Sequence, residues 1–233
     1  MNNPFKSFEK IFCINLAERQ DRWSISEQHF KQLEIDNYER INAVKVNGNI
    51  SPKRKGQIGC ALSFTFCIDK IIKGNLKNSL ILEDDFEFKL EKDLLFSKLE
   101  KCLNELPLDW DSLYLGGTVG NFYGVNPLQN YSSNLFKLNC AYTTHAIAFS
   151  NKGAQKIKEI FQNDENWRNK IIENYEAIDI FLAKDYLIQT NSFITNDLLC
   201  YQRINHSNIE CNTYDYSGLM DNNFQFFKSK MNK

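Results

Sequence analysis

The chain has 233 residues, enough for one large domain or two small ones, and its 42% apolar content is compatible with a globular core. The formal net charge of −1 gives no support for a nucleic-acid-binding protein, and 10 glycines with 4 prolines argue against low complexity. No apolar run is long enough to span a membrane and the first residues lack the apolar core of a signal peptide, so we expect a soluble, cytoplasmic protein.

The seven cysteines are an odd set without a C-x-x-C pair, which disfavours a structural zinc site. Most of them stand in apolar segments, as expected for small buried residues in a reducing compartment. We assign no nucleophilic role to any of them.

Residues 11–16 are predicted to form a first strand, and residues 17–23 a polar turn that opens a helix. Arg19 and Arg22 would then stand near the amino end of this helix, where free N–H groups, the helix dipole and bidentate guanidinium groups favour phosphate. The alternative is a solvated helix start in which Asp21 pairs with an arginine. These residues alone favour the alternative.

Residues 38–44 are predicted to form a second, short strand, followed by a loop over 47–52. A helical pattern then runs from Gly56 through Ile71, and its two early glycines indicate a close backbone approach. Their spacing fits neither a Walker motif nor a dinucleotide-binding motif.

A buried strand is predicted at Leu80–Leu82, and it is followed at once by Glu83, Asp84 and Asp85. Adjacent carboxylates repel one another unless a cation sits among them, and Mg²⁺ and Mn²⁺ prefer oxygen ligands. In open α/β sheets ligands bind beyond the carboxyl ends of strands. An extended backbone directs Glu83 and Asp85 to one side and Asp84 to the other. A solvated acidic turn is an equally supported alternative.

The rest of the chain continues the alternation of strands and helices, which predicts the α/β class. The expected elements are a helical pattern over 86–107 with Leu94, Leu95, Leu99, Cys102 and Leu106 on one face, a strand over 110–117, a long irregular loop over 118–139, a strand over 141–149, a helix over 151–161, a helical segment over 175–182, and one or two strands within 192–202. No internal repeat or interdomain linker is evident.

The C-terminal segment, residues 212–233, combines aromatic residues with lysines, and we separate it from the domain formed by residues 1–211. A short helix of this kind can contact an anionic membrane surface or a partner subunit. More often, such a helix packs back on its own domain.

Five stretches together resemble glycosyltransferase family 25, the lipooligosaccharide-type galactosyltransferases related to the collagen galactosyltransferases. The stretches are Ile14-Asn15-Leu16 with Arg19, Asp21 and Arg22; Gly59-Cys60-Ala61-Leu62-Ser63; Leu80-Ile81-Leu82-Glu83-Asp84-Asp85; Thr144-His145-Ala146 with Gly153-Ala154; and Gln202 with Ser207 and Ile209. The glycine-cysteine stretch and the acidic stretch are the most specific of them.

The resemblance implies a GT-A-type, Rossmann-like single domain with a mostly parallel central sheet flanked by helices. It also implies metal-dependent, inverting transfer of a hexose, galactose or glucose, from a UDP-sugar to a glycan, lipid-linked or protein hydroxyl, as in lipooligosaccharide biosynthesis. By carry-over, the acidic stretch is the donor and metal motif, and Asn15, Arg19 and Arg22 lie on the nucleotide side. Two positions depart from the family pattern: Phe64 replaces His and Asn208 replaces Asp. They keep open a catalytically silent nucleotide-sugar or glycan-binding protein.

For the mechanism we expect Mn²⁺ or Mg²⁺ at Asp85 with Asp84, and a late His206 as a further ligand. A second group must take the proton of the acceptor hydroxyl. Asp179 is the first candidate because apolar neighbours would raise its pKa, and Glu176 is the second. A capping or solvated helix acid explains Asp179 about equally well.

Three further residues are candidates for acceptor contacts: His145, Gly117 and Gln202. A histidine on an apolar strand is more commonly a satisfied core residue than a ligand-binding one. A metal-dependent phosphohydrolase that uses the same acids is the remaining alternative, but the scattered ligands of a two-metal site are not evident.

Overall fold

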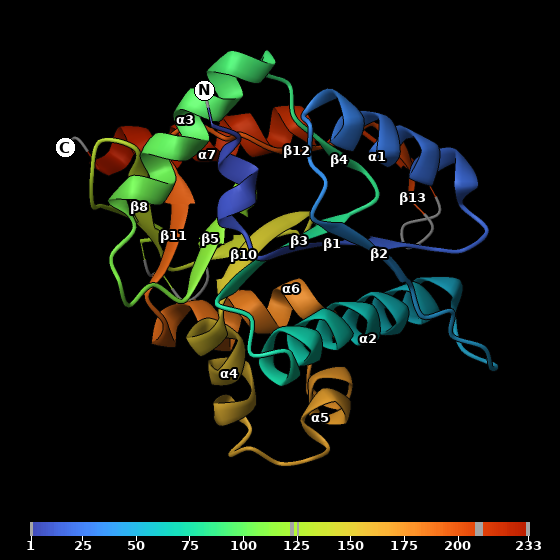
Figure 1. Cartoon of the computed structure of the whole chain (residues 1–233). Coiled ribbons are helices and arrows are strands. Elements are labelled where there is room, and N and C mark those ends of the chain that lie inside the picture. The colour runs from blue at the N-terminus through green and yellow to red at the C-terminus, as the bar shows by residue number, and fades with distance from the viewer. Residues whose placement is uncertain (1, 122–123, 125, 208–211, 232–233) are drawn as a thin grey trace.

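The computed structural model describes residues 2–121, 124, 126–207 and 212–231, without the side chains of 205–207 and 212–214. An eight-stranded sheet runs through the centre of the molecule (Figure 1). In spatial order its strands are β2 (Tyr38–Asn42), β1 (Lys10–Asn15), β3 (Asn78–Glu83), β10 (Ala146–Ser150), β5 (Ser112–Tyr114), β11 (Ser192–Thr195), β8 (Leu135–Leu138) and β7 (Leu128–Asn130). Three strand pairs lie outside it: β4 (Phe86–Glu87) with β12 (Tyr201–Gln202), β6 (Thr118–Val119) with β9 (Ala141–Tyr142), and β13 (Asn205–Ser207) with β14 (Asn212–Tyr214).

Six of the eight central strands run in one direction, because only β10 and β8 pair antiparallel with the neighbours on both of their sides. The neighbours β2, β1 and β3 are all parallel, so their carboxyl ends meet at one edge of the sheet. The prediction of an α/β domain with a mostly parallel sheet is confirmed.

Helices cover both faces of the sheet (Figure 1). The helices are α1 (Gln20–Gln32), α2 (Pro52–Lys73), α3 (Lys92–Glu105), α4 (Asn151–Ile160), α5 (Trp167–Asn174), α6 (Ile178–Phe181) and α7 (Ser217–Met231), with short helical turns η1 (Pro4–Ser7), η2 (Leu182–Tyr186) and η3 (Leu187–Gln189). Helices α1 and α3 lie on one face and α2, α4 and α6 on the other, each over its own apolar cluster. Alternate residues of β1 serve the two clusters: Ile11 and Cys13 one, Phe12 and Ile14 the other.

Local signals explain the bounds of α2, the helix that lies beside the acidic strand end. Ser51 caps its first turn by accepting a hydrogen bond from the Arg54 backbone N–H at 3.2 Å, and Pro52 occupies the first turn. The helix ends at Lys73 before Gly74, and it begins at Pro52, inside the predicted loop over 47–52 and ahead of Gly56, where the predicted helical pattern starts.

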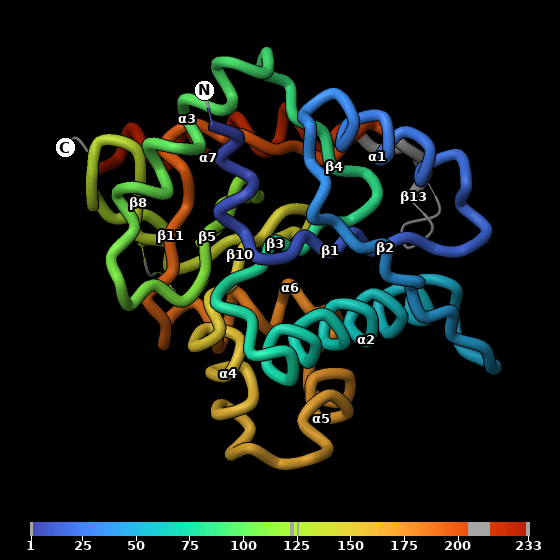
Figure 2. The backbone as a smooth tube through the Cα atoms, viewed as in Figure 1, coloured from blue at the N-terminus to red at the C-terminus, as the bar shows by residue number. Residues whose placement is uncertain are grey.

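The predicted long loop over 118–139 is wrong, because the described part of this segment contains β6, β7 and β8. Strands β7 and β8 form an antiparallel pair that extends the central sheet beyond β11. In the backbone trace β8 lies beside β11, a segment far away in sequence (Figure 2). Strands this short are stabilised by pairing with their neighbours, and they contain too few residues to show a clear strand pattern in the sequence.

Two other predicted elements are corrected. Phe86 and Glu87 pair with β12 instead of starting a helix, and α3 begins only at Lys92. On α3 the Leu94 side chain is 48% exposed, whereas Leu95, Leu99 and Cys102 are buried. The expected strand over 141–149 is interrupted at Thr143, which has a φ of 70°, so it divides into β9 and β10.

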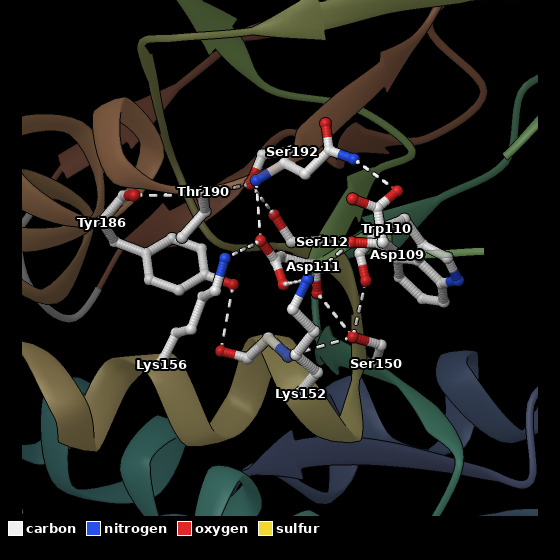
Figure 3. A network of polar contacts seen from close by, with 12 residues as sticks. Asp109, Trp110, Asp111, Ser112, Ser150, Lys152, Lys156, Tyr186, Thr190 and Ser192 are labelled. Carbon is white, nitrogen blue, oxygen red and sulfur yellow. Dashed lines mark hydrogen bonds and ion pairs between the residues drawn. The ribbon is translucent and has the colours of Figure 1, made fainter. Parts of the chain in front are cut away.

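A buried polar network joins β5, β11 and α4 at the end of the sheet opposite to the acidic residues (Figure 3). The fully buried Asp111 carboxylate accepts hydrogen bonds from the Lys156 ammonium group at 2.6 Å and from the Asn191 backbone N–H at 2.7 Å. The Ser112 hydroxyl donates to the Ser192 hydroxyl at 2.7 Å, across the β5–β11 pair. A Cβ atom at Gly153 would lie 1.9 Å from the Asp111 carbonyl oxygen, so glycine permits this close approach of α4.

The C-terminal helix α7 packs on the same molecule, over β6 and β7. Its Met220 and Phe224 side chains are buried and belong to an apolar cluster that also includes residues of β7 and β8. The six cysteines within the described residues are free thiols, and Cys60 is the one that is not fully buried. Among the described helices, none combines the length and apolar character that crossing a membrane requires.

Candidate active site

The acidic residues stand at the carboxyl end of β3, directly beside the end of β1. The register pairs Ile14 with Glu83, which brings Asn15 next to Asp84. A cavity of about 360 Å³ opens at this edge, and we call it the first cavity. Among the residues that line it are Asn15, Arg22, Val44, Lys45, Lys55, Gly59, Cys60, Glu83, Asp84, Asp85 and Gln202.

Asp84 is held by a set of polar contacts. Its carboxylate accepts a hydrogen bond from the Asn15 side-chain amide at 2.5 Å and from the Arg22 guanidinium at 2.7 Å. Arg40 in turn donates to the Asn15 side-chain oxygen at 2.5 Å, and Arg203 donates to the Asp84 carbonyl oxygen at 2.9 Å. Because both Asp84 oxygens are engaged, this carboxylate stabilises the end of β3 and orients Asn15 and Arg22.

Asp85 differs from its neighbour. Its Oδ2 lies 3.6 Å from the Arg22 guanidinium, and its buried Oδ1 has no hydrogen-bond partner among the described residues. Burial, followed by repulsion from Asp84, raises the pKa of Asp85 to about 6. An ionised carboxylate with a buried, unpaired oxygen is unfavourable by itself and would gain from a bound cation.

Glu83 stands on the wall between the first cavity and a second one. Its carboxylate accepts a hydrogen bond from the Thr144 hydroxyl. Burial and then the nearby Asp85 raise the pKa of Glu83 to about 8. Glu83 therefore binds its proton more tightly than an exposed glutamate does.

The second cavity has a volume of about 320 Å³ and shares Cys60, Glu83 and Gln202 with the first. Its other lining residues within the described chain are Gln57, Thr118, Tyr142, Thr143, Thr144, Ala177, Ile178, Asp179, Tyr216 and Leu219. None of these carries a cationic side chain, whereas Arg22, Lys45 and Lys55 line the first cavity. The site thus consists of one compartment lined by both cations and acids, and one whose described lining holds no cation, and the two meet at Glu83.

Asp179 lines the second cavity at the start of α6. Its carboxylate accepts hydrogen bonds from the backbone N–H groups of Thr143 at 3.2 Å and Ile180 at 2.9 Å. Burial raises the pKa of Asp179 in spite of these contacts. The two N–H groups fix the orientation of a carboxylate that is a stronger base than an exposed aspartate.

The glycine and serine of the Gly59-Cys60-Ala61-Leu62-Ser63 stretch shape the wall of the first cavity. A Cβ atom at Gly59 would lie 2.4 Å from the Val44 carbonyl oxygen, so only glycine allows α2 and this loop to touch. The Ser63 hydroxyl accepts a hydrogen bond from the Val44 N–H at 2.8 Å and donates to the Gly59 carbonyl at 2.6 Å. Of the two early glycines at which a close approach was expected, Gly59 shows it.

Two candidate residues lie away from the cavities. Arg19 pairs with Asp21 at 2.8 Å, as in the alternative of an internal ion pair, and it is not among the residues that line the first cavity. Glu176 is exposed and lies in a separate hollow beside Arg54, which donates to the Glu176 carbonyl oxygen at 2.6 Å. The structure brings Asp179 near Glu83, but not Glu176.

The three candidates for acceptor contacts differ in whether they line a cavity. His145 is fully buried, its Nε2 lies 3.2 Å from the Cys200 carbonyl oxygen, and burial lowers its pKa to about 4, as expected for a core histidine. Gly117 is packed near Tyr114 and Tyr142 and lines neither cavity. Gln202 lines both cavities.

The implied divalent cation has partial support from the residues present. Within the described residues there is no cluster of three or more His, Cys, Asp or Glu side chains arranged to hold a metal. The unpaired Asp85 Oδ1 is, however, the kind of hard oxygen ligand that Mg²⁺ and Mn²⁺ use together with phosphate oxygens. The chain therefore fits a cation held by one carboxylate and by its substrate. The His206 side chain lies outside the described residues.

Several site residues had no predicted role, although Thr144 stands in one of the stretches that resemble the family. Arg40, Thr144 and Arg203 contact Asn15, Glu83 and Asp84 respectively, and Tyr216 lines the second cavity. Thr144 and Arg203 each adjoin a residue that was singled out, His145 and Gln202. No local signal pointed to Tyr216.

The departure at Phe64 removes nothing from either cavity. Its side chain is fully buried and packs edge to face on Phe149, with 5.8 Å between the ring centroids. Asn208, the other departure, lies outside the described residues.

Comparison with known proteins gives one family. Residues 8–198 match a family described as Glycosyltransferase family 25 (LPS biosynthesis protein). Procollagen galactosyltransferase 2 of Mus musculus is 27% identical over 170 residues, covering 64% of this chain and 27% of the relative. Procollagen galactosyltransferase 1-B of Xenopus laevis is 31% identical over 175 residues, covering 65% and 28%. The match thus spans little more than a quarter of these relatives.

Among solved structures, a glycosyltransferase involved in the glycosylation of the major capsid of PBCV-1 gives a TM-score of 0.40 at 8% identity, covering 94% of this chain and 98% of that one.

Proposed function

The chain belongs to glycosyltransferase family 25, and from this we propose that it transfers a hexose, galactose or glucose, with inversion from a UDP-sugar to a hydroxyl group. The acceptor is a glycan, lipid-linked or protein hydroxyl, as in lipooligosaccharide assembly. The observation that carries the proposal is the pair of adjoining cavities that meet at Glu83: the first is lined by cations as well as acids, and the described lining of the second holds no cation. An anionic donor and a hydroxyl acceptor would need these two environments side by side.

The first cavity suits a nucleoside diphosphate. Lys45, Lys55 and Arg22 line it and supply donors for a diphosphate, although Lys45 also pairs with Glu18 at 2.6 Å and Arg22 with Asp84 at 2.7 Å. Val44 and Val46 supply apolar surface for a base or ribose. Asp84 holds Arg22 and Asn15 in place before the donor binds, which reduces the ordering cost of binding.

Mn²⁺ or Mg²⁺ would be held by Asp85 together with donor phosphate oxygens, with Asp84 near and His206 as a proposed further ligand. When bound, the ion supplies a Lewis acid that neutralises charge on the departing diphosphate. The residues of the chain bind and orient the donor around it. Asp85 is the carboxylate most in need of a cation, because its Oδ1 is unpaired among the described residues.

Asp179 would accept the proton of the attacking hydroxyl as the bond to the anomeric carbon forms and the bond to the diphosphate breaks. Its raised pKa and its two backbone contacts suit this role. Glu176, the second candidate, is exposed beside Arg54 and lacks the cavity position of Asp179.

The first experiment is a thermal-shift and calorimetric screen of UDP, UDP-galactose, UDP-glucose and UDP-N-acetylglucosamine, each with Mn²⁺ and with EDTA. A ligand at a hundredfold excess over its Kd stabilises the folded state by about 2.7 kcal/mol. We expect metal-dependent stabilisation by one UDP-sugar. No response from any of these ligands, with the protein folded, would reject the proposal.

Turnover is then compared in Asp179→Asn and Glu176→Gln. Loss of a general base typically lowers kcat by about 10²- to 10⁴-fold, and we expect this loss only in Asp179→Asn. Unchanged turnover in Asp179→Asn would refute its role. Donor binding by the unsubstituted protein without turnover on any acceptor would favour the silent binding protein instead.

Peripheral membrane contact through α7 is also proposed. Phe226 is 52% exposed, and the Lys230 ammonium group lies 4.1 Å from its ring centroid, so an aromatic and a cationic group face outward together. Co-sedimentation with anionic vesicles that is lost in Phe226→Ala would support this contact, and equal sedimentation of both proteins would refute it.

A further inference from the structure

The residues that line the second cavity have charges and unpaired polar atoms that transfer to a hydroxyl group does not by itself require. We propose that it selects a neutral saccharide acceptor, and that Tyr216 and Leu219 at the start of α7 form the wall that sets this selection. The inference rests on the proposed function and specifies the substrate class of the same site. Three observations support it: the charges of the residues around the cavity, the unpaired polar atoms that line it, and the place of Tyr216 and Leu219 in the chain.

The charges around the second cavity disfavour an anionic sugar. Glu83 and Asp179 both line it, and the described lining contains no lysine or arginine. A carboxylate or phosphate on the acceptor would lose water of hydration without gaining a cationic partner, and it would lie near the Asp179 carboxylate. A neutral sugar avoids both costs.

The unpaired polar atoms favour a ligand rich in hydroxyl groups. Within the described residues, the buried Thr118 Oγ1, Thr143 Oγ1 and Gln202 Oε1 have no hydrogen-bond partner, and all three residues line the second cavity. Thr118 as a residue is 8% exposed. Hydroxyl oxygens accept and donate, whereas an amide oxygen only accepts, so sugar hydroxyls can satisfy all three.

The wall of the cavity comes from the C-terminal helix. Tyr216 and Leu219 lie beyond residue 198, where the match to the family ends. The turn that carries them is fixed, because the Met220 N–H donates to the Tyr216 carbonyl at 2.9 Å and the Met220 side chain is fully buried. The Tyr201 hydroxyl also donates to Asp221 at 2.8 Å. This chain can therefore set acceptor choice with a segment outside the region that matches its family.

The test uses sugar pairs that differ only at C6: methyl β-galactopyranoside with its uronate, and methyl β-glucopyranoside with its uronate. Binding to the full chain is measured by NMR titration, with and without UDP and Mn²⁺. We expect at least one neutral glycoside to bind at least about tenfold more tightly than its uronate.

Tyr216→Ala should weaken binding of the neutral glycoside about fivefold through loss of aromatic contact area. Leu219 is 47% exposed, so Leu219→Lys adds a cation at the rim without disturbing the core, and it should tighten uronate binding about threefold. Phe226→Ala, an exposed aromatic on the same helix that does not line the cavity, should change neither.

Uronates that bind as tightly as the neutral glycosides, or no binding by any glycoside in either condition, would overturn the inference. The inference would also be overturned if Tyr216→Ala and Leu219→Lys bound the glycosides and uronates with the same affinities as Phe226→Ala. UDP-sugar binding to the first cavity is measured on the same proteins. Its absence alongside selective glycoside binding would reject the transferase proposal but not acceptor selection, and the reverse pattern would reject only selection.

Discussion

Replacing Asp85 by asparagine should make the ligand-free protein more stable at neutral pH. Asp85 is ionised at pH 7.5 although its folded environment opposes the charge: it is buried, it lies next to Asp84, and its Oδ1 has no partner among the described residues. Arg22, at 3.6 Å, compensates only in part, because its guanidinium also serves Asp84 at 2.7 Å. Asparagine keeps the shape of the side chain and removes the charge.

The magnitude follows from the rise of the Asp85 pKa from 3.8 to about 6. At 1.36 kcal/mol for each pH unit this rise corresponds to about 3 kcal/mol. The side chain is 16% exposed, and relaxation toward water lowers the expected gain to about 1–3 kcal/mol. Because the folded pKa lies above the unfolded one, the penalty is absent below pH 3.8, grows as the pH rises, and is complete above about pH 6.

Urea unfolding of both proteins at pH 7.5 and pH 4 measures this difference. We expect Asp85→Asn to raise the free energy of unfolding at pH 7.5 and to match the unsubstituted protein more closely at pH 4. Asp21→Asn is the control of opposite sign, since the Arg19 hydrogen bond lowers the Asp21 pKa to about 2. That exposed substitution should lower stability slightly at pH 7.5.

The reasoning is refuted if Asp85→Asn destabilises the protein at pH 7.5, or if its gain is equal at the two pH values. The same variant should lose the metal-dependent stabilisation by UDP-sugar. If Asp85→Asn is more stable but no longer responds to UDP-sugar, then the Asp85 carboxylate serves ligand binding and destabilises the fold.

Three further outcomes are expected. Asp111→Ala leaves the Lys156 ammonium group and a backbone N–H without their buried partner and should cost about 3–5 kcal/mol in urea unfolding, and a loss below 1 kcal/mol would contradict it. Gly59→Ala forces the Val44 loop outward and should weaken UDP-sugar binding about tenfold, whereas Gly218→Ala, with open space around its Cβ, serves as the unaffected control. His145, whose folded pKa of about 4 lies below the unfolded 6.5, should lower stability by up to about 3 kcal/mol as the pH falls from 6.5 to 4. Urea unfolding of His145→Gln over this range should lack that contribution, and an unchanged slope would contradict it.

The parts of the fold that sequence predicted well are those with a strong local signal. The apolar run before Glu83 identified β3 because a buried parallel strand is apolar on both faces. The helical pattern from Gly56 identified most of α2, whereas Ser51 and Pro52, which cap and open this helix, were placed in a predicted loop. β7 and β8 gave no such signal, since antiparallel strands of three and four residues near the edge of a sheet depend on pairing.

The sequence by itself determined that three carboxylates follow a strand, and that a helix with two early glycines precedes this strand along the chain. Only the tertiary structure decided how the acids differ: Asn15 and Arg22 engage Asp84, and Asp85 keeps an unpaired oxygen. It also brought Tyr216 to the second cavity from a helix far along the chain. The physical reason is range. Periodicity and caps are local properties of a chain, whereas the environment of a carboxylate or a cavity is set by neighbours that folding brings together.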